Sequence, residues 1–128
     1  MRALLDTHTF LWWVTDDPQL SSLARAIIED GGNELYLSAA SAWEIAIKVQ
    51  TGRLPLPVSP AEFVPQHMQA SGFQPMPVQI THALRVYDLP PLHRDPFDRL
   101  LVAQALAEGL PIITADPLIR QYESEAIW

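Results

Sequence analysis

Four acidic residues of this chain lie where an apolar, strand-like segment gives way to a helix-like segment, or just inside that helix: Asp6, Glu44, Asp98 and Asp116. In an open parallel sheet with crossover helices, the carboxyl ends of all strands point to one edge, so acids placed there converge. Converging carboxylates select hard cations such as Mg²⁺ and Mn²⁺, which can activate a bound water as a nucleophile. The pattern therefore predicts a metal site.

Helix capping offers a competing explanation for three of these acids. Ser41 followed by Glu44 matches a capping box, and Asp95 followed by a proline and Asp98 matches an N-cap with an acid in the first turn. Asp116, also followed by proline, repeats this pattern. For any one of the three, the structural explanation is at least as good as the functional one.

Asp6 differs from the other acids, because capping does not naturally explain it. It directly follows Leu4 and Leu5 at the end of a segment that we expect to be a buried central strand. Burial of an unpaired carboxylate is costly, and no lysine lies near the predicted strand ends to compensate for it. A bound cation or a buried partner would remove that cost.

The elements that position the acids follow from hydrophobic patterning and from Gly and Pro punctuation. We predict strands over 3–6, 35–38 and 112–114, an edge or irregular strand over 73–78, and an edge strand over 126–128. Helices are predicted over 9–14, 22–30, 40–51, 79–86 and 97–108, with others beginning near residue 60 and after residue 116. This order predicts an α/β fold.

Composition narrows the classes further. We expect one domain over residues 1–128, of which 48% are hydrophobic. No segment resembles a membrane span or a cleavable leader, so a soluble cytoplasmic protein is expected. The absence of cysteine excludes disulfides and thiolate zinc sites. The net charge of -7 argues against a general nucleic-acid binder, although the predicted site itself contributes part of this acidity.

Several residues near the acids have two explanations. Lys48, Arg94 and Arg99 either grip the phosphates of a substrate or pair with neighbouring acids, and we hold both open. His8 either touches substrate or metal, or is an ordinary hydrogen-bonded imidazole. The remaining histidines and the tryptophans are expected in structural or peripheral roles: His67, His82 and His93, and Trp12, Trp13 and Trp43 as core or dimer contacts.

Four motifs taken together resemble those of PIN-domain proteins, specifically the toxin ribonucleases of VapBC toxin–antitoxin pairs. The motifs are Leu4-Leu5-Asp6-Thr7-His8, Ser41-Ala42-Trp43-Glu44-Ile45, Asp95-Pro96-Phe97-Asp98-Arg99 and Thr114-Ala115-Asp116. The resemblance covers essentially the whole chain. It implies a three-layer α/β/α fold with a central parallel sheet of four or five strands.

The same resemblance implies a function and a set of roles. The chain would be a Mg²⁺- or Mn²⁺-dependent endoribonuclease, commonly a homodimer, silenced by a cognate antitoxin. Asp6, Glu44, Asp98 and Asp116 correspond to the acidic quartet that binds the metal, and Thr114 corresponds to the hydroxyl residue beside the last acid. Between the two candidates in the third motif, the spacing to Val102 favours Asp98 as the ligand and leaves Asp95 as the N-cap.

Two alternative functions remain at this point. A receiver-like signalling domain also gathers acids at the carboxyl edge of a parallel sheet, but it needs a lysine after its last strand, and no lysine follows Lys48. A PIN fold retained only for binding RNA or a protein is the other alternative, which the complete set of four acids makes less attractive.

Overall fold

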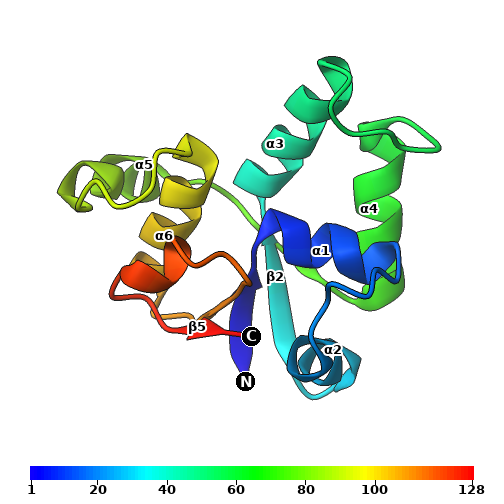
Figure 1. Cartoon of the computed structure of the whole chain (residues 1–128), viewed down its shortest axis with the longest axis horizontal. Helices are drawn as coiled ribbons and strands as arrows, with labels where there is room; N and C mark the ends of the chain where they lie inside the picture. The colour runs from blue at the N-terminus through cyan, green and yellow to red at the C-terminus, as the bar shows by residue number, and fades with distance from the viewer.

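The computed structural model describes all 128 residues and contains one five-stranded parallel sheet with helices on both faces (Figure 1). The strands are β1 (Arg2–Leu5), β2 (Glu34–Ser38), β3 (Gln74–Met76), β4 (Ile112–Ile113) and β5 (Ala126–Ile127). Their order across the sheet is β3-β2-β1-β4-β5. The first strand is therefore central, with Leu5 level with Leu37 on one side and Ile113 on the other.

The helices account for most of the remaining chain. They are α1 (Thr7–Val14), α2 (Ser22–Glu29), α3 (Ala39–Gln50), α4 (Pro60–Ser71), α5 (Ile80–Arg85) and α6 (Pro96–Glu108), with two 3-10 turns, η1 (Val86–Asp88) and η2 (Ile119–Gln121). None of them combines the length and the apolar character that crossing a membrane requires.

Alternate residues of the central strand enter two separate cores. Ala3 and Leu5 pack into one core, which holds buried residues of α1 to α4, whereas Leu4 packs into the other, beneath α6. Both faces of the sheet are therefore covered, which explains why its strands are nearly continuous apolar runs. The predicted three-layer α/β/α fold is confirmed.

The predicted elements are present, with differences at their ends. The segment 73–78 does form an edge strand, β3, as its two prolines require. The predicted helix after Asp116 is only the 3-10 turn η2, because an Asp116 carboxylate oxygen accepts a hydrogen bond from the Leu118 N–H and forms a tight turn first. Trp43 is not a core residue, since 59% of it is exposed.

Candidate functional site

All four predicted acids lie at the carboxyl edge of the sheet. Asp6 follows β1, and Asp116 follows β4 after Thr114 and one further residue. Glu44 lies in the second turn of α3, the helix that leaves β2, and Asp98 is the third residue of α6. The charges of Glu44 and Asp116 both act on the carboxyl of Asp98, so residues far apart in sequence form one cluster.

Asp6 is the most tightly held member of the cluster. It is 4% exposed, and one carboxylate oxygen accepts a hydrogen bond of 2.7 Å from the Thr9 N–H, which makes Asp6 the N-cap of α1. The expectation that capping would not explain Asp6 is therefore wrong. Its capping bond uses one oxygen, and the Thr114 hydroxyl donates to the other. Burial raises the pKa of Asp6, against the opposing effect of these hydrogen bonds.

Thr114 links two of the acids through its hydroxyl group. The hydroxyl donates to Asp6 and accepts a hydrogen bond of 3.0 Å from the backbone N–H of Asp116. Thr114 is fully buried, so this connection is shielded from water. Its side chain thereby fixes the end of β4 relative to the end of β1.

Glu44 has one oxygen paired and the other unpaired. Only 2% of its side chain is exposed; Oε2 lies 2.6 Å from the Lys48 ammonium, while Oε1 is buried without any hydrogen-bond partner. The capping-box explanation is wrong, because α3 begins at Ala39 with Ser38 as its N-cap. An orphaned buried carboxylate oxygen is costly and marks a missing donor or cation.

The two aspartates of the third motif take different roles. A carboxylate oxygen of Asp95 accepts hydrogen bonds from the N–H groups of Phe97 and Asp98, as an N-cap does. Asp98 instead extends into the acidic cluster, where burial, followed by the charges of Asp95 and Glu44, raises its pKa to about 7. The structure thus separates the cap from the cluster residue in the predicted way.

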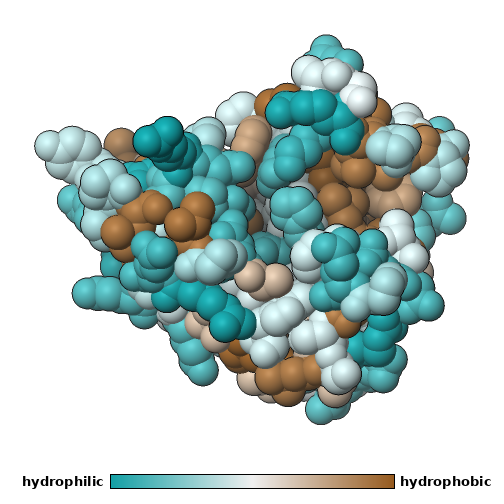
Figure 2. Space-filling view, in the orientation of Figure 1, coloured by the Kyte–Doolittle hydropathy of each residue, from teal (hydrophilic) through white to brown (hydrophobic).

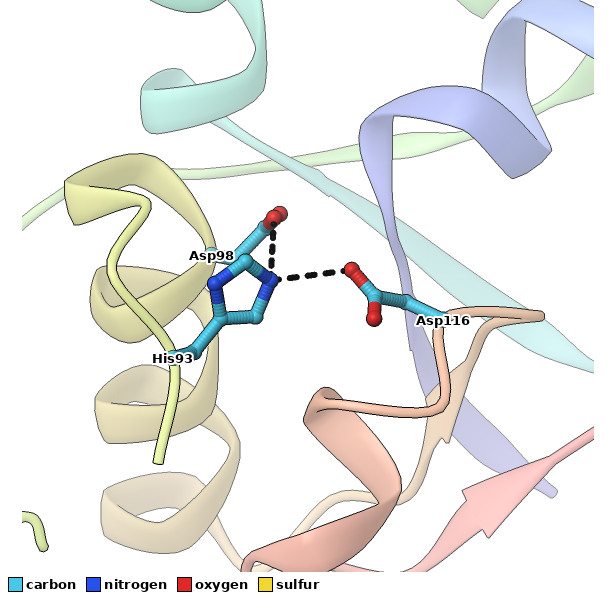
Figure 3. A group of neighbouring side chains, drawn as sticks. All are labelled: His93, Asp98 and Asp116. Carbon is cyan, nitrogen blue, oxygen red and sulfur yellow. Dashed lines mark hydrogen bonds and ion pairs between the residues drawn. The ribbon is translucent and has the colours of Figure 1, made fainter. Parts of the chain in front are cut away.

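His93 lies between two acids, which differs from the structural or peripheral role predicted for it. Its Nε2 is 3.0 Å from Asp98 Oδ2 and 2.9 Å from Asp116 Oδ2 (Figure 3). Its Nδ1 accepts a hydrogen bond from the Asp95 N–H, which leaves the proton on Nε2. In this tautomer His93 is a hydrogen-bond donor to the acids, whereas a metal ligand needs a bare nitrogen. The one sequence signal was its position two residues before the N-cap.

The nearby cations are mostly engaged. The Arg99 guanidinium donates to the carbonyl oxygens of Pro90 and Val86 and to the Tyr122 hydroxyl, and so fastens the loop before α6. The predicted pairing of Arg99 with a neighbouring acid is therefore wrong, while its contact with a substrate phosphate stays a prediction. Lys48 is paired with an acid, whereas Arg94 is exposed.

These side chains fit a hard divalent cation. Ligand atoms of Asp98 and Asp116 lie within 4.8 Å of one another beside His93, Asp6 shares a hollow with Asp116, and the charge of Glu44 acts on Asp98. Two of the four acids have raised pKa values, and only one ammonium group is paired with them. A bound cation would give Glu44 Oε1 its missing partner and would offset the mutual repulsion of the acids. Asp6, Glu44 and Asp98 would be its main ligands, and Asp116 would complete the site directly or through water.

The chain is similar in sequence to a known protein family and to two ribonucleases. The model of the PIN domain family matches residues 3–124. Ribonuclease VapC22 of Mycobacterium tuberculosis is 30% identical over 123 residues, which cover 94% of this chain and 91% of that protein. Ribonuclease VapC16 of the same organism is 48% identical over 58 residues, 45% of this chain and 41% of that protein.

Solved structures agree at the level of fold. A structure of VapBC2 from Rickettsia felis bound to a promoter DNA fragment superposes with a TM-score of 0.72 at 12% identity, covering 100% of this chain and 99% of that one. A toxin–antitoxin complex from Klebsiella pneumoniae gives a TM-score of 0.68 at 16% identity, covering 98% and 96%.

Proposed function

Because this chain belongs to the PIN domain family and has VapC ribonucleases as relatives, we propose that it is a metal-dependent endoribonuclease, the toxin of a toxin–antitoxin pair. The single observation that supports catalysis most is the unpaired, buried Oε1 of Glu44 within a cluster of four acids. A protein that only binds RNA or a partner has no need for such a strained arrangement. The family match excludes the receiver-like alternative.

The residues of the chain have distinct tasks in this proposal. Asp6, Glu44, Asp98 and Asp116 hold Mg²⁺ or Mn²⁺, which supplies charge stabilisation at the phosphate and an activated water. Thr114 keeps Asp6 and Asp116 in register, and His93 orients Asp98 and Asp116 from the opposite side. Loss of such a contact to a metal ligand typically lowers metal affinity or activity by about 10- to 100-fold. Arg94 and His8 remain proposed substrate contacts.

The test is cleavage of an end-labelled mixed RNA pool by the protein freed of any antitoxin, with Mg²⁺ or Mn²⁺ and with an EDTA control. Asp6→Asn should abolish cleavage and keep the fold, because its amide oxygen can still accept the Thr9 N–H that caps α1. Asp30→Asn is the matched control, since it removes the same charge from an exposed position after α2.

The outcomes separate the remaining functions. Fragments that require metal and disappear in Asp6→Asn, but not in Asp30→Asn, support the nuclease and its site together. Equal cleavage by Asp6→Asn and the parent would refute the site. Intact RNA under every condition would favour the non-catalytic binding module.

We also propose that the protein forms a homodimer through α5 and η1. Three apolar side chains recur there at helical spacing and are largely exposed, Ile80 by 79%, Leu84 by 68% and Tyr87 by 93%. Such a concentration of exposed apolar side chains is typical of an interface. Leu84→Glu should therefore give a monomer in light scattering, whereas an unchanged mass would place the interface elsewhere.

A cognate antitoxin is the second proposed partner. The structural neighbours named above include a toxin–antitoxin complex. An apolar hollow of about 390 Å³ lies between β2, α3, α4 and β3, with Ala42, Met68 and Met76 in its wall. Hydrophobic surface is visible between α3 and α4 in Figure 2. A candidate antitoxin should stop cleavage at a stoichiometric ratio, and Ala42→Glu should weaken that inhibition without slowing cleavage.

A further inference from the structure

A small hollow opens beside the acidic cluster and shares its wall with two of the acids. It has a volume of about 240 Å³ and is lined by Asp6, His8, Trp12, Ala115 and Asp116. We call it the Trp12 hollow. Because Asp6 and Asp116 belong to both, any group that fills the hollow lies next to the position where a phosphate would meet the cluster.

Two aromatic rings of the Trp12 hollow differ in how firmly they are held. The Trp12 ring contacts the His8 ring on one side and the Trp128 ring on another, each with centroids 5.7 Å apart. Trp12 also packs against the core beneath α1. His8, in contrast, is exposed, and its imidazole forms no hydrogen bond within the chain, unlike His82 and His93. The hollow thus has a fixed aromatic wall and a free polar group.

The size and chemistry of the hollow favour one planar heterocycle. Pockets for drug-sized ligands usually measure roughly 300–1,000 Å³, so this volume suits a single base rather than a dinucleotide or a folded peptide. An indole wall offers stacking to any base, and an imidazole can donate to or accept from a base edge. A base fits both groups.

The charge of the protein also favours contacts with a base. The net charge is -7, Lys48 is paired with Glu44, and Arg99 is occupied by carbonyl oxygens. Of the basic side chains near the acids, only Arg94 is then left exposed, so attraction between phosphates and basic side chains, which dominates most nucleic-acid binding, is limited here. Contacts to bases must supply a larger share of the affinity.

We propose that the Trp12 hollow binds one unstacked nucleobase of the RNA, adjacent to the phosphate that is cleaved. This inference rests on the proposed nuclease function and extends it. A base inside a duplex is stacked on both faces and paired along one edge, so it cannot enter the hollow, and the substrate is single-stranded at that position. The His8 side chain then sets which base is preferred there, and Trp12 provides the stacking surface.

The first experiment measures binding in the absence of metal and needs no catalysis. The four nucleoside 5′-monophosphates are titrated into the protein while the indole N–H signal of Trp12 is followed by NMR, assigned by its loss in Trp12→Phe. Base-dependent shifts are expected. Ribose 5-phosphate, which lacks a base, should cause none. Trp12→Leu should weaken binding about 5-fold or more, and Trp12→Phe should retain most of it.

The second experiment measures base preference around the cut in a randomised single-stranded RNA pool. His8→Ala should reduce the preference at one position next to the cut by about 5-fold, the effect of losing one hydrogen bond, with other positions unchanged. Trp43→Leu is the matched control, because Trp43 is an exposed tryptophan on α3 that does not line the hollow. It should leave that position unaffected.

The outcomes distinguish this inference from the proposed function. RNA cleavage with unchanged base preference in His8→Ala and no NMR shift would overturn the base pocket alone and make a protein side chain the better occupant. Base-dependent shifts in a protein that cleaves no RNA would support the pocket and refute the nuclease. Identical shifts with ribose 5-phosphate would also overturn the pocket, since the base would then be irrelevant.

Discussion

The molecule contains two networks in which a buried or partly buried histidine meets a carboxylate, and they are built alike. In each, the histidine Nδ1 accepts a backbone N–H, from Gln79 to His82 and from Asp95 to His93. In each, Nε2 then faces a carboxylate, that of Glu108 at 2.8 Å for His82 and those of two aspartates for His93. The local construction is the same, so the difference between them lies in the surroundings.

The network around His82 is satisfied. Gln104 is fully buried; its carbonyl oxygen accepts from the Ser38 hydroxyl, and its amide donates to the Pro77 carbonyl oxygen. The one acid, Glu108, is 41% exposed and keeps contact with water. The network around His93 has four acids, raised pKa values and an unpaired oxygen. We infer that the first network stabilises the fold, and we propose that the second binds the cation.

The largest expected effect comes from neutralising the second network. Asp98→Asn should reduce metal-dependent cleavage by about 1,000-fold or more, because one charged ligand of the proposed cation is lost. Asp95→Asn should cleave within a few-fold of the parent, since asparagine also caps helices well. Single-turnover cleavage of one RNA measures both. Equal losses in the two variants would contradict the division between cap and ligand.

A substitution in the first network, around His82, should instead lower the stability of the protein. Gln104→Leu leaves the Pro77 carbonyl oxygen and the Ser38 hydroxyl without their partner, which should lower the free energy of unfolding by about 2–4 kcal/mol. Urea unfolding measures it. Cleavage per folded molecule should stay unchanged. A loss of cleavage with normal stability would mean that the two networks are coupled.

The pH dependence of stability should also reflect the second network. The pKa of Asp98 is raised to about 7, whereas that of an unfolded aspartate is about 3.9. Between these values the folded protein holds a proton that the unfolded chain has lost, so the free energy of unfolding falls as the pH rises. Without metal, we expect a loss on the order of 2 kcal/mol from about pH 5 to about pH 7.

Two comparisons sharpen that pH prediction. Asp98→Asn should remove most of the slope, because the amide does not titrate. Mg²⁺ should stabilise the parent more at about pH 8 than at about pH 5, since the cation competes with the proton for the same carboxylates. If the unfolding free energy of the metal-free protein is independent of pH in this range, the pKa of Asp98 is not raised in the folded state.

A smaller effect, on Mg²⁺ affinity, is expected from replacing His93, which contacts Asp98 and Asp116 in the second network. His93→Ala should weaken Mg²⁺ binding by about 10-fold, as loss of an outer contact typically does. His82→Ala, the counterpart in the first network, should leave Mg²⁺ binding unchanged and reduce stability. Calorimetric titration of each variant with Mg²⁺, in the absence of RNA and with all four acids intact, compares the pair. The prediction fails if both variants bind the ion equally well.

The smallest effect on stability is expected from replacing Lys48, whose ammonium group pairs with Glu44 in the second network. With Mg²⁺ present, Lys48→Met should change the free energy of unfolding by less than about 1 kcal/mol, because the cation then compensates the Glu44 carboxylate, which is 2% exposed and would otherwise be left with both oxygens unpaired. It should tighten Mg²⁺ binding slightly, since Lys48 competes for Glu44. A large rise in KM for RNA, with Mg²⁺ affinity unchanged, would instead show that Lys48 contacts phosphate.

Much of the acidic site can be predicted from the sequence, because the fold topology determines where the strand ends lie. Parallel strands with crossover helices bring their carboxyl ends to one edge, so the convergence of Asp6 and Asp116 follows from recognising the strands. The N-cap at Asp95 follows from local hydrogen-bonding rules. Each of these inferences depends on short-range patterns or on topology, both of which the order of residues specifies.

Other features depend on side-chain direction across the fold, which local patterns do not specify. His93 is an unremarkable loop residue until α6 and the turn after β4 place two carboxylates at its Nε2. Arg99 has an acid as a near neighbour, yet its guanidinium turns to the loop carbonyls. Trp43 has apolar neighbours in sequence, but α3 presents it to solvent. Its helical position relative to Ile45 was the available signal.

The strand order has a consequence for synthesis of the protein. The central strand β1 pairs with β4, which joins Leu4 to Ile112 across almost the entire chain. Such distant pairing is slow to form, and a nascent chain folds from its N-terminal end while the remainder is still on the ribosome. Until Thr114 and Asp116 emerge, Asp6 lacks its hydroxyl partner and the acidic edge is incomplete. We therefore expect the chain to be inert towards the messenger RNA that encodes it until translation is nearly finished.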